Sequence, residues 1–217
     1  MDEHKRTQRQ YDEKYGGKSF YWTTCPSATC FEVLKRIPPD RDLRLLDIGC
    51  GEGRNAVFFA RNGYRVDAFD ISEKGVEKTV RLAKEAGVIV NAFKADLNRF
   101  RLSETYDILF STGVLHSSDP SMRNELFENY KAFTKEGGLN VFSVFVKKPF
   151  IAPGPDGDPN ASPWKSGQLF TYYHDWRIEW CTEEIFDCMS SGVPHKHAVN
   201  RIIARKETSQ QRADTGT

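Results

Sequence analysis

The segment LLDIGCGEGRNAVFFARNGYRVDAFDIS, residues 45–72, decides the fold. It opens with apolar residues that end in Asp47, passes through closely spaced glycines into a helical stretch, and closes with a second apolar run that ends in Asp70. A strand, a glycine-rich turn and a helix in this order are typical of a nucleotide cradle, because glycine lets the backbone approach a ligand and the helix start presents free N–H groups. An acid at the end of the second strand is suited to accept hydrogen bonds from ribose hydroxyls, so we assign that role to Asp70.

The glycine spacing separates two classes of cofactor. Gly49, Gly51 and Gly53 read G-x-G-x-G, whereas dinucleotide enzymes use G-x-G-x-x-G and seat the pyrophosphate on the helix start. The carboxylate of Asp47 would repel a pyrophosphate, but it suits a ligand with an ammonium group. S-adenosylmethionine (SAM) is a nucleoside with an ammonium, a sulfonium and no phosphate, so we expect Asp47, Gly49 and Gly51 to bind its methionine end. A dinucleotide-dependent oxidoreductase and a SAM-binding module without catalysis remain alternatives.

Working outward from this segment, strand and helix patterns alternate. The sequence predicts parallel strands at 43–48, 64–70, 88–96, 106–115 and 139–146. Helices are predicted at 25–37, 53–63, 72–87, 121–138 and 167–176, and two final strands at 177–190 and 197–206. Strands separated by helices imply right-handed crossovers. We therefore expect a single-domain, Rossmann-like α/β fold with a mainly parallel seven-stranded sheet and a C-terminal antiparallel hairpin.

Composition limits the partners and the location. The chain of 217 residues has a net charge of +1 and no apolar run of membrane-spanning length, and its first residues do not form a secretory signal. Its five cysteines include no C-x-x-C pair, which favours a reducing cytoplasm. We expect a small-molecule substrate, no nucleic-acid or membrane partner, and a monomer or homodimer. The first ten residues and the polar tail at 207–217 are expected to be loose.

Several segments together resemble a known family. GCGEGRNAVFFARNGYRVDAFD, ADLNRF, GQLFTYYHDW and GVPHKHAVNRIIARK are similar to the tellurite-resistance (TehB-like) methyltransferases, within the class I SAM-dependent methyltransferases. The resemblance implies methyl transfer from SAM to a small molecule such as a tellurite or selenite oxyanion. It also implies functional roles for Arg54 and Asn55 after the glycines, and for His195 and Lys196 in the last hairpin. A small thiol, hydroxyl or amine metabolite is the alternative acceptor.

The class I resemblance also places the remaining cofactor contacts. It implies that Ile71 flanks the adenine, that Asp96 and Leu97 meet the adenine edge, and that the fourth strand ends beside the sulfonium. The residues assigned to the fourth strand end and to an N-terminal arm that covers the cofactor are Ser111, Thr112, Tyr21 and Trp22. This organisation corresponds to an arm at 1–42, a methyltransferase domain at 43–206 and a tail at 207–217.

The candidate catalytic residues are His195, Lys196 and His116. An oxyanion acceptor needs positive groups to hold its oxygens, whereas a hydroxyl acceptor needs a base, which His195 or His116 would supply. Strand alternation predicts that His195 and His197 share a face and that Lys196 points the other way. A histidine pair suggests a metal, but with no third ligand near and a spacing poor for zinc, no metal site is predicted. The segment at 147–167, rich in proline and glycine, is a candidate lid or a disordered insertion.

Overall fold

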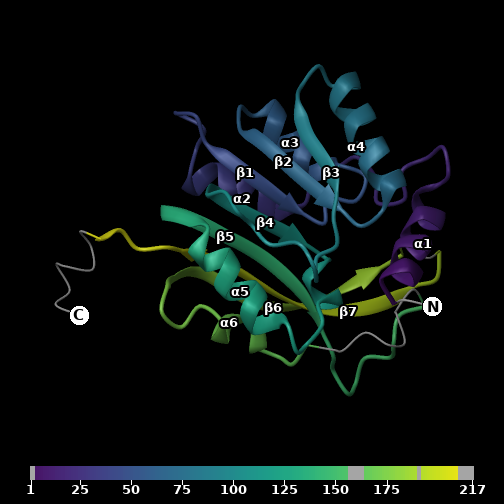
Figure 1. Ribbon diagram of the computed structural model, residues 1–217. Helices are drawn as coiled ribbons and strands as arrows, with labels where there is room; N and C mark the ends of the chain where they lie inside the picture. Colours follow the sequence, from purple (N-terminus) through teal and green to yellow (C-terminus); the bar gives the residue numbers. More distant parts are fainter. Residues whose placement is uncertain (1–2, 156–163, 190–191, 210–217) are drawn as a thin grey trace. The chain divides into compact units, whose positions relative to one another are not determined.

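The computed structural model describes residues 3–155, 164–189 and 192–209 (Figure 1). The chain divides into two compact units, residues 1–100 and 101–217. The elements of the first unit are α1 (Glu3–Tyr15), α2 (Ala28–Arg36), β1 (Arg44–Ile48), α3 (Arg54–Arg61), β2 (Arg65–Asp70), α4 (Glu73–Glu85) and β3 (Val90–Lys94). The elements of the second unit are β4 (Tyr106–Thr112), the short 3-10 helix η1 (Leu115–Ser117), α5 (Arg123–Ala132), β5 (Thr134–Val146), α6 (Gln168–Thr171), β6 (Arg177–Cys188) and β7 (His195–Arg205).

Within the described residues, seven strands form one sheet in the order β3-β2-β1-β4-β5-β7-β6. Strands β1, β2 and β3 run parallel, as do β4 and β5, whereas β7 runs antiparallel to both β5 and β6. This confirms the predicted α/β fold with a mainly parallel sheet and a C-terminal antiparallel hairpin. In the described part of the chain, every helix is too short or too polar to cross a membrane.

The first unit is built on β1 and β2, whose residues are buried almost throughout. The crossover helices α3 and α4 pack against each other and against β2, and α1 contacts the start of α4 (Figure 1). The hydroxyl of Ser72 caps α4 by accepting the N–H of Gly75 at 3.0 Å, as its position before the helix predicts.

The expectation that the first ten residues are loose is wrong, because α1 begins at residue 3. Two contacts hold this helix in place. The carboxylate of Asp12 accepts the hydroxyl of Ser72 at 2.7 Å and the N–H of Lys74 at 3.2 Å, and Tyr15 is buried at the helix end. This polar helix is therefore held by residues that follow β2, and the local sequence of the helix does not reveal these contacts.

The second unit has an aromatic core between α5, β5 and α6. Phe127 stacks on Tyr172 with 4.2 Å between ring centroids and lies edge-on to Phe142 and Trp164. The indole N–H of Trp164 donates to the carbonyl of Leu115 at 3.2 Å. The predicted lid segment at 147–167 is described only in part, since 156–163 lie outside the described residues, and its lid role stays a prediction.

The helix predicted to reach Gly137 and Gly138 ends earlier, at Ala132, and β5 begins at Thr134. Pairing decides this boundary: the N–H of Gly137 donates to the carbonyl of Lys206 at 2.8 Å, and the N–H of Lys206 donates to the carbonyl of Gly138 at 3.0 Å. Glycine at 138 also permits close approach, because an added Cβ would lie 2.7 Å from a backbone oxygen of the neighbouring β4.

Candidate functional site

The turn between β1 and α3 depends on glycine. Gly49, Gly51 and Gly53 have φ values of 71°, 56° and 90°, which fall in the left-handed region that side chains disfavour. The N–H groups of Gly49 and Cys50 both donate to the carbonyl of Phe69, at 2.8 and 2.9 Å. This tie to β2 holds the turn at the ends of two neighbouring strands.

Gly53→Ala is expected to destabilise the protein more than the backbone angle alone explains. A Cβ at Gly53 would lie 2.8 Å from the Cα, Cγ2 and Oγ1 atoms of Thr79, so overpacking adds to backbone strain and the total cost is about 2–4 kcal/mol. Gly87→Ala is the matched control, because Gly87 has φ +68° and an added Cβ there would meet nothing within 4 Å. Urea denaturation compares the two variants, and equal losses of unfolding free energy would contradict the packing argument.

Asp47 is a buried acid with one unsatisfied oxygen. Its side chain is 2% exposed, and among the described residues its Oδ2 atom has no hydrogen-bond partner. The pKa of Asp47 is raised to about 7, mainly by burial; the charge of Arg54 opposes the rise, and the charge of Asp70 contributes to it. A buried carboxylate with an unpartnered oxygen is costly, so this position suits a cationic or hydrogen-bond-donating ligand.

Asp70, the last residue of β2, accepts hydrogen bonds from the backbone of the turn and of the segment that follows β2. Its Oδ2 atom accepts the N–H of Gly51 and its Oδ1 atom accepts the N–H of Ser72, both at 2.9 Å. Burial raises the pKa of Asp70 to about 6, although these two N–H groups act to lower it. Ile71 follows it and is half-buried. The predicted contacts of Asp70 with ribose and of Ile71 with adenine remain predictions.

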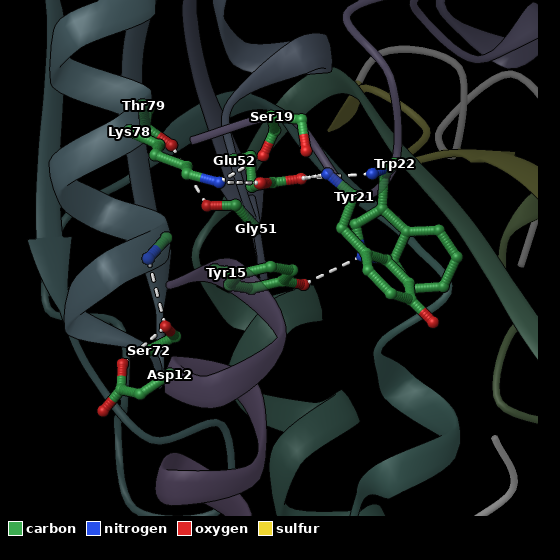
Figure 2. Close-up of polar contacts among 11 residues, drawn as sticks. Asp12, Tyr15, Ser19, Tyr21, Trp22, Gly51, Glu52, Ser72, Lys78 and Thr79 are labelled. Carbon is green, nitrogen blue, oxygen red and sulfur yellow. Dashed lines mark hydrogen bonds and ion pairs between the residues drawn. The ribbon is translucent and has the colours of Figure 1, made fainter. Parts of the chain in front are cut away.

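Residues 16–27, between α1 and α2, form the part of the N-terminal arm that is attached to the turn through Glu52 (Figure 2). The Oε2 atom of Glu52 accepts the N–H groups of Tyr21 and Trp22 at 2.8 and 3.1 Å. Its Oε1 atom pairs with Nζ of Lys78 at 2.7 Å, and Lys78 also donates to the carbonyl of Ser19 at 2.7 Å. Both charged side chains are buried. Sequence reasoning missed this pair, although an acid inside a glycine-rich turn was a visible signal.

Aromatic side chains of α1 and the arm lie over Gly51. The indole N–H of Trp22 donates to the hydroxyl of Tyr15 at 3.0 Å (Figure 2). A Cβ at Gly51 would lie 3.2 Å from the hydroxyl oxygen of Tyr15 and 3.9 Å from Cδ1 of Trp22. The tyrosine and tryptophan therefore cover the turn closely, at the position where the arm is predicted to cover a cofactor.

Arg54 and Asn55 also contact the arm. An Nη1 hydrogen of Arg54 donates to the carbonyl of Trp22 at 3.2 Å. The Oδ1 atom of Asn55 accepts the N–H of Ser27 at 2.9 Å and the thiol of Cys30 at 3.3 Å. These two side chains thus position the covering segment, and a direct cofactor contact for either stays a prediction.

The residues predicted at the adenine edge lie beside α1. The Oδ2 atom of Asp96 lies 2.7 Å from Nδ1 of His4, and its Oδ1 atom accepts the N–H of Asn98 at 2.9 Å. Leu97 is buried. The predicted cofactor residues between Asp47 and Asn55, together with Asp70, Tyr21 and Trp22, therefore gather around one turn and the segment that covers it. Asp96 instead contacts α1 through His4.

Three predicted residues lie near the end of β4 in the second unit. Ser111 is fully buried, and Thr112 is the last residue of the strand. His116 lies in η1 with its ring 4.8 Å from the ring of Phe145, centroid to centroid. Their roles toward cofactor or acceptor stay predictions.

The last hairpin separates its histidines from its lysine. Nε2 of His195 lies 2.9 Å from Nε2 of His197, which confirms that they share a face. Nζ of Lys196 pairs with Oδ1 of Asp187 at 2.7 Å, so the structure does not bring Lys196 to the histidine pair. Cys188 on β6 lies beside both histidines, and the expectation that no third metal-ligating group is near is therefore wrong.

The other positive groups of β7 are also paired with acids of β6. Arg201 pairs with Glu184 at 3.1 Å, and Arg205 pairs with Glu179. An oxyanion pocket built from hairpin cations would have to compete with these carboxylates. The neutralised hairpin therefore weakens the argument that an anionic acceptor binds there.

Asp47 is the penultimate residue of β1 and Asp70 the last residue of β2, and both lie beside a glycine-rich turn. This arrangement is typical of Rossmann-like α/β folds. The family model described as "Tellurite resistance protein TehB" matches residues 9–202, and the chain belongs to this family. It is 26% identical over 198 residues to a Haemophilus influenzae protein named "Probable S-adenosyl-L-methionine-dependent methyltransferase TehB", covering 90% of this chain and 67% of that protein.

Two further similarities bear on the fold and on the length of the chain. The crystal structure of TehB from Haemophilus influenzae has the same fold, with a TM-score of 0.74 and 22% identity over 92% of this chain and 67% of that one. The chain is also 31% identical over 164 residues to "Hemagglutinin 1" from Eikenella corrodens, covering 76% of this chain. It spans about half, 52%, of that relative's length.

Proposed function

We propose that this protein is a SAM-dependent methyltransferase that acts on a small molecule. The observation that carries the proposal is the buried Asp47 carboxylate, whose Oδ2 atom has no partner among the described residues, beside a glycine-rich turn. A dinucleotide would bring negative charge to this acid, whereas SAM brings an ammonium group. The methyltransferase name of the Haemophilus influenzae relative supports the same activity.

The residues of the turn fit this cofactor. Asp47 accepts hydrogen bonds from its ammonium group, Asp70 accepts from its ribose, and Ile71, Asp96 and Leu97 contact its adenine. When bound, SAM supplies a methyl group that its sulfonium already activates. Tyr15 and Trp22 exclude water and offer ring faces to a cation. The same proposal includes four further cofactor contacts, Ser111, Thr112, Tyr21 and Arg54, with Asn55 holding the arm.

For the acceptor, we propose tellurite or selenite first, because of the family to which the chain belongs. A chalcogen lone pair needs no strong base, so His195 and His116 would only bind the oxygens of the anion. Lys196, which is paired with Asp187 away from the histidines, would contribute long-range attraction alone. A neutral thiol is the second candidate. The pairing of Lys196 with Asp187 and of Arg201 with Glu184 favours it, since the net positive charge of the hairpin is reduced. A thiol acceptor would use His195 or His116 as its base.

The experiment is methyl transfer from labelled SAM by the purified full chain. Tellurite, selenite, a simple alkanethiol and a catechol are compared, with volatile products trapped from the headspace. We expect saturable transfer to at least one of the four acceptors. Asp70→Ala serves as the cofactor-site variant, and the loss of one charge-assisted hydrogen bond, about 1.5–3 kcal/mol, is expected to weaken SAM binding by about 10- to 100-fold.

Calorimetric titration with SAM separates the possible failures. Absence of SAM binding by the wild-type chain contradicts the proposed function as a whole. Binding of SAM with transfer to the thiol alone rejects the oxyanion acceptors and supports the second candidate. Binding of SAM with no transfer to any of the four rejects the acceptor classes proposed here.

A further inference from the structure

We propose that Cys188, His195 and His197 form a binding site for a zinc-class divalent metal ion in the β6–β7 hairpin. Each side chain offers one ligand atom, and these three atoms all lie within 4.8 Å of one another. All three residues are half-buried. None of the three ligands is a proposed SAM contact, so metal binding can be measured without SAM. An ion on Nε2 of His195 would, however, take that nitrogen out of the acceptor roles proposed for it and leave those roles to His116.

The strand register explains why these residues meet. Cys188 is the cross-strand partner of His195, and Phe186 is the partner of His197. Directly opposed residues of antiparallel strands project on the same face, and so do residues two apart in one strand. A cysteine and two histidines separated by seven and two positions are therefore placed on one side of the hairpin.

A hydrogen bond to His195 prepares its other nitrogen for a metal. Nδ1 of His195 lies 2.7 Å from the carbonyl oxygen of Val193. A carbonyl only accepts, so in the neutral ring Nδ1 carries the proton and Nε2 keeps its lone pair. Metal-ligating histidines commonly donate their second N–H to a backbone carbonyl in this way. The lone pair of Nε2 faces His197, whose Nε2 atom is 2.9 Å away.

The ligand set matches zinc, and its two imidazole nitrogens lie close to the distance that zinc requires. Zinc binds imidazole nitrogen at about 2.0–2.1 Å, so two nitrogens on one tetrahedral ion lie roughly 3.3 Å apart. The two Nε2 atoms are 2.9 Å apart, so side-chain movements of a few tenths of an ångström would bring them to that distance. A thiolate with two imidazoles binds zinc in preference to magnesium or calcium. Three protein ligands leave a fourth position for water or another donor.

Neighbouring groups hold the ligand side chains in place. The ring of Phe145 stacks on His197 with 4.6 Å between centroids, and the ring of Phe186 lies 5.7 Å from it. The backbone at Gly154 approaches both imidazoles, since an added Cβ there would lie 3.1 Å from Cδ2 of His195 and 3.2 Å from Cε1 of His197. A rigid, partly shielded cluster loses less conformational freedom when it binds an ion.

The test uses the full chain without a metal-binding tag, stripped with a chelator and kept reduced. Titration calorimetry with Zn²⁺ is expected to show one ion per chain and the release of protons, because the thiol must ionise to bind. Titration with Co²⁺ is expected to give a thiolate-to-cobalt charge-transfer band together with visible d–d bands of tetrahedral intensity. A wild-type chain that gives neither a Zn²⁺ isotherm nor the charge-transfer band overturns the proposal, whatever the variants do.

Matched variants locate the site. Cys188→Ser and His197→Gln are each expected to weaken Zn²⁺ binding by at least about tenfold, as even the loss of an outer partner does, and Cys188→Ser is expected to remove the charge-transfer band. Cys181→Ser, at an exposed cysteine of the same strand, and His174→Gln are expected to leave both signals unchanged. Equal losses in the control variants would overturn the proposal. The readouts require neither SAM nor an acceptor, so their failure is distinguishable from failure of the proposed function.

Discussion

Asp47→Asn is expected to stabilise the ligand-free protein at about pH 8 and to abolish measurable SAM binding. The carboxylate is fully buried, with Oδ2 unpartnered among the described residues. Asparagine has the same shape without the charge, so the variant avoids the cost of ionising a buried acid. It also removes the charge of residue 47, which would attract the ammonium group of SAM. Stability and binding therefore change in opposite directions.

The sign of the pH dependence follows from the raised pKa. Asp47 has a folded-state pKa of about 7 against an ordinary value of 3.8. An acid with a raised folded pKa contributes stability that is complete below its unfolded pKa and is lost as pH rises through the folded one. We expect the unfolding free energy of the wild type to fall between about pH 4 and 7. Asp47→Asn is expected to lack the part of this fall that Asp47 causes. At about pH 8 the variant gains on the order of 1–3 kcal/mol, less than the full shift because the amide must also be buried.

The pH dependence of SAM binding also tests the ionisation of Asp47. In the wild type, affinity is expected to rise with pH as Asp47 ionises, until the α-amino group of SAM loses its proton near pH 8. Asp67→Asn is the control, since Asp67 is a buried acid of β2 that is paired with Arg44 and Asn91. That variant should lose stability and keep its SAM affinity. Wild-type SAM affinity in Asp47→Asn, or lower stability at the higher pH, would contradict the argument.

The part of the fold that was predicted correctly rests on local patterns. Strand and helix signals around residues 45–72 lie within a few residues of one another, and the carboxyl ends of parallel strands meet at one edge. The start of β5 was missed because Gly137 and Gly138 look like a helix end. Their pairing with Lys206 decides the boundary, and a partner that distant leaves no trace in the local pattern.

The position of the candidate site could be predicted from strand ends, whereas contacts between residues distant in the sequence could not. Asp47 and Asp70 follow from their places at the ends of β1 and β2. Lys78 lies on α4 among other charged residues and reads as part of a solvated face, yet its partner Glu52 is 26 positions earlier. Cys188 beside His195 depends on the register of a hairpin, which strand periodicity alone leaves undetermined.

Glu52→Ala is expected to destabilise the protein by about 3–5 kcal/mol, because it leaves the buried charge of Lys78 without its ion-pair partner. Glu52 and Lys78 are 3% and 6% exposed and lie 2.7 Å apart. The same change leaves the N–H groups of Tyr21 and Trp22 without their acceptor. Urea denaturation measures the loss. Hydrogen exchange at these two amides is expected to accelerate more than exchange in the strands, which would show that the arm detaches first.

Two variants separate the buried charge from the general effect of removing an acid. Glu32→Ala breaks surface pairs with Lys35 and Arg36 and should change stability by less than about 1 kcal/mol. The double variant Glu52→Gln with Lys78→Met removes both buried charges, so it should recover much of the stability while the arm amides keep a weaker acceptor. A loss in Glu52→Ala no greater than in Glu32→Ala would mean that the pair does not anchor the arm. Recovery of stability in the double variant with SAM binding still weakened would mean that a charged Glu52 is needed to hold the arm over the turn.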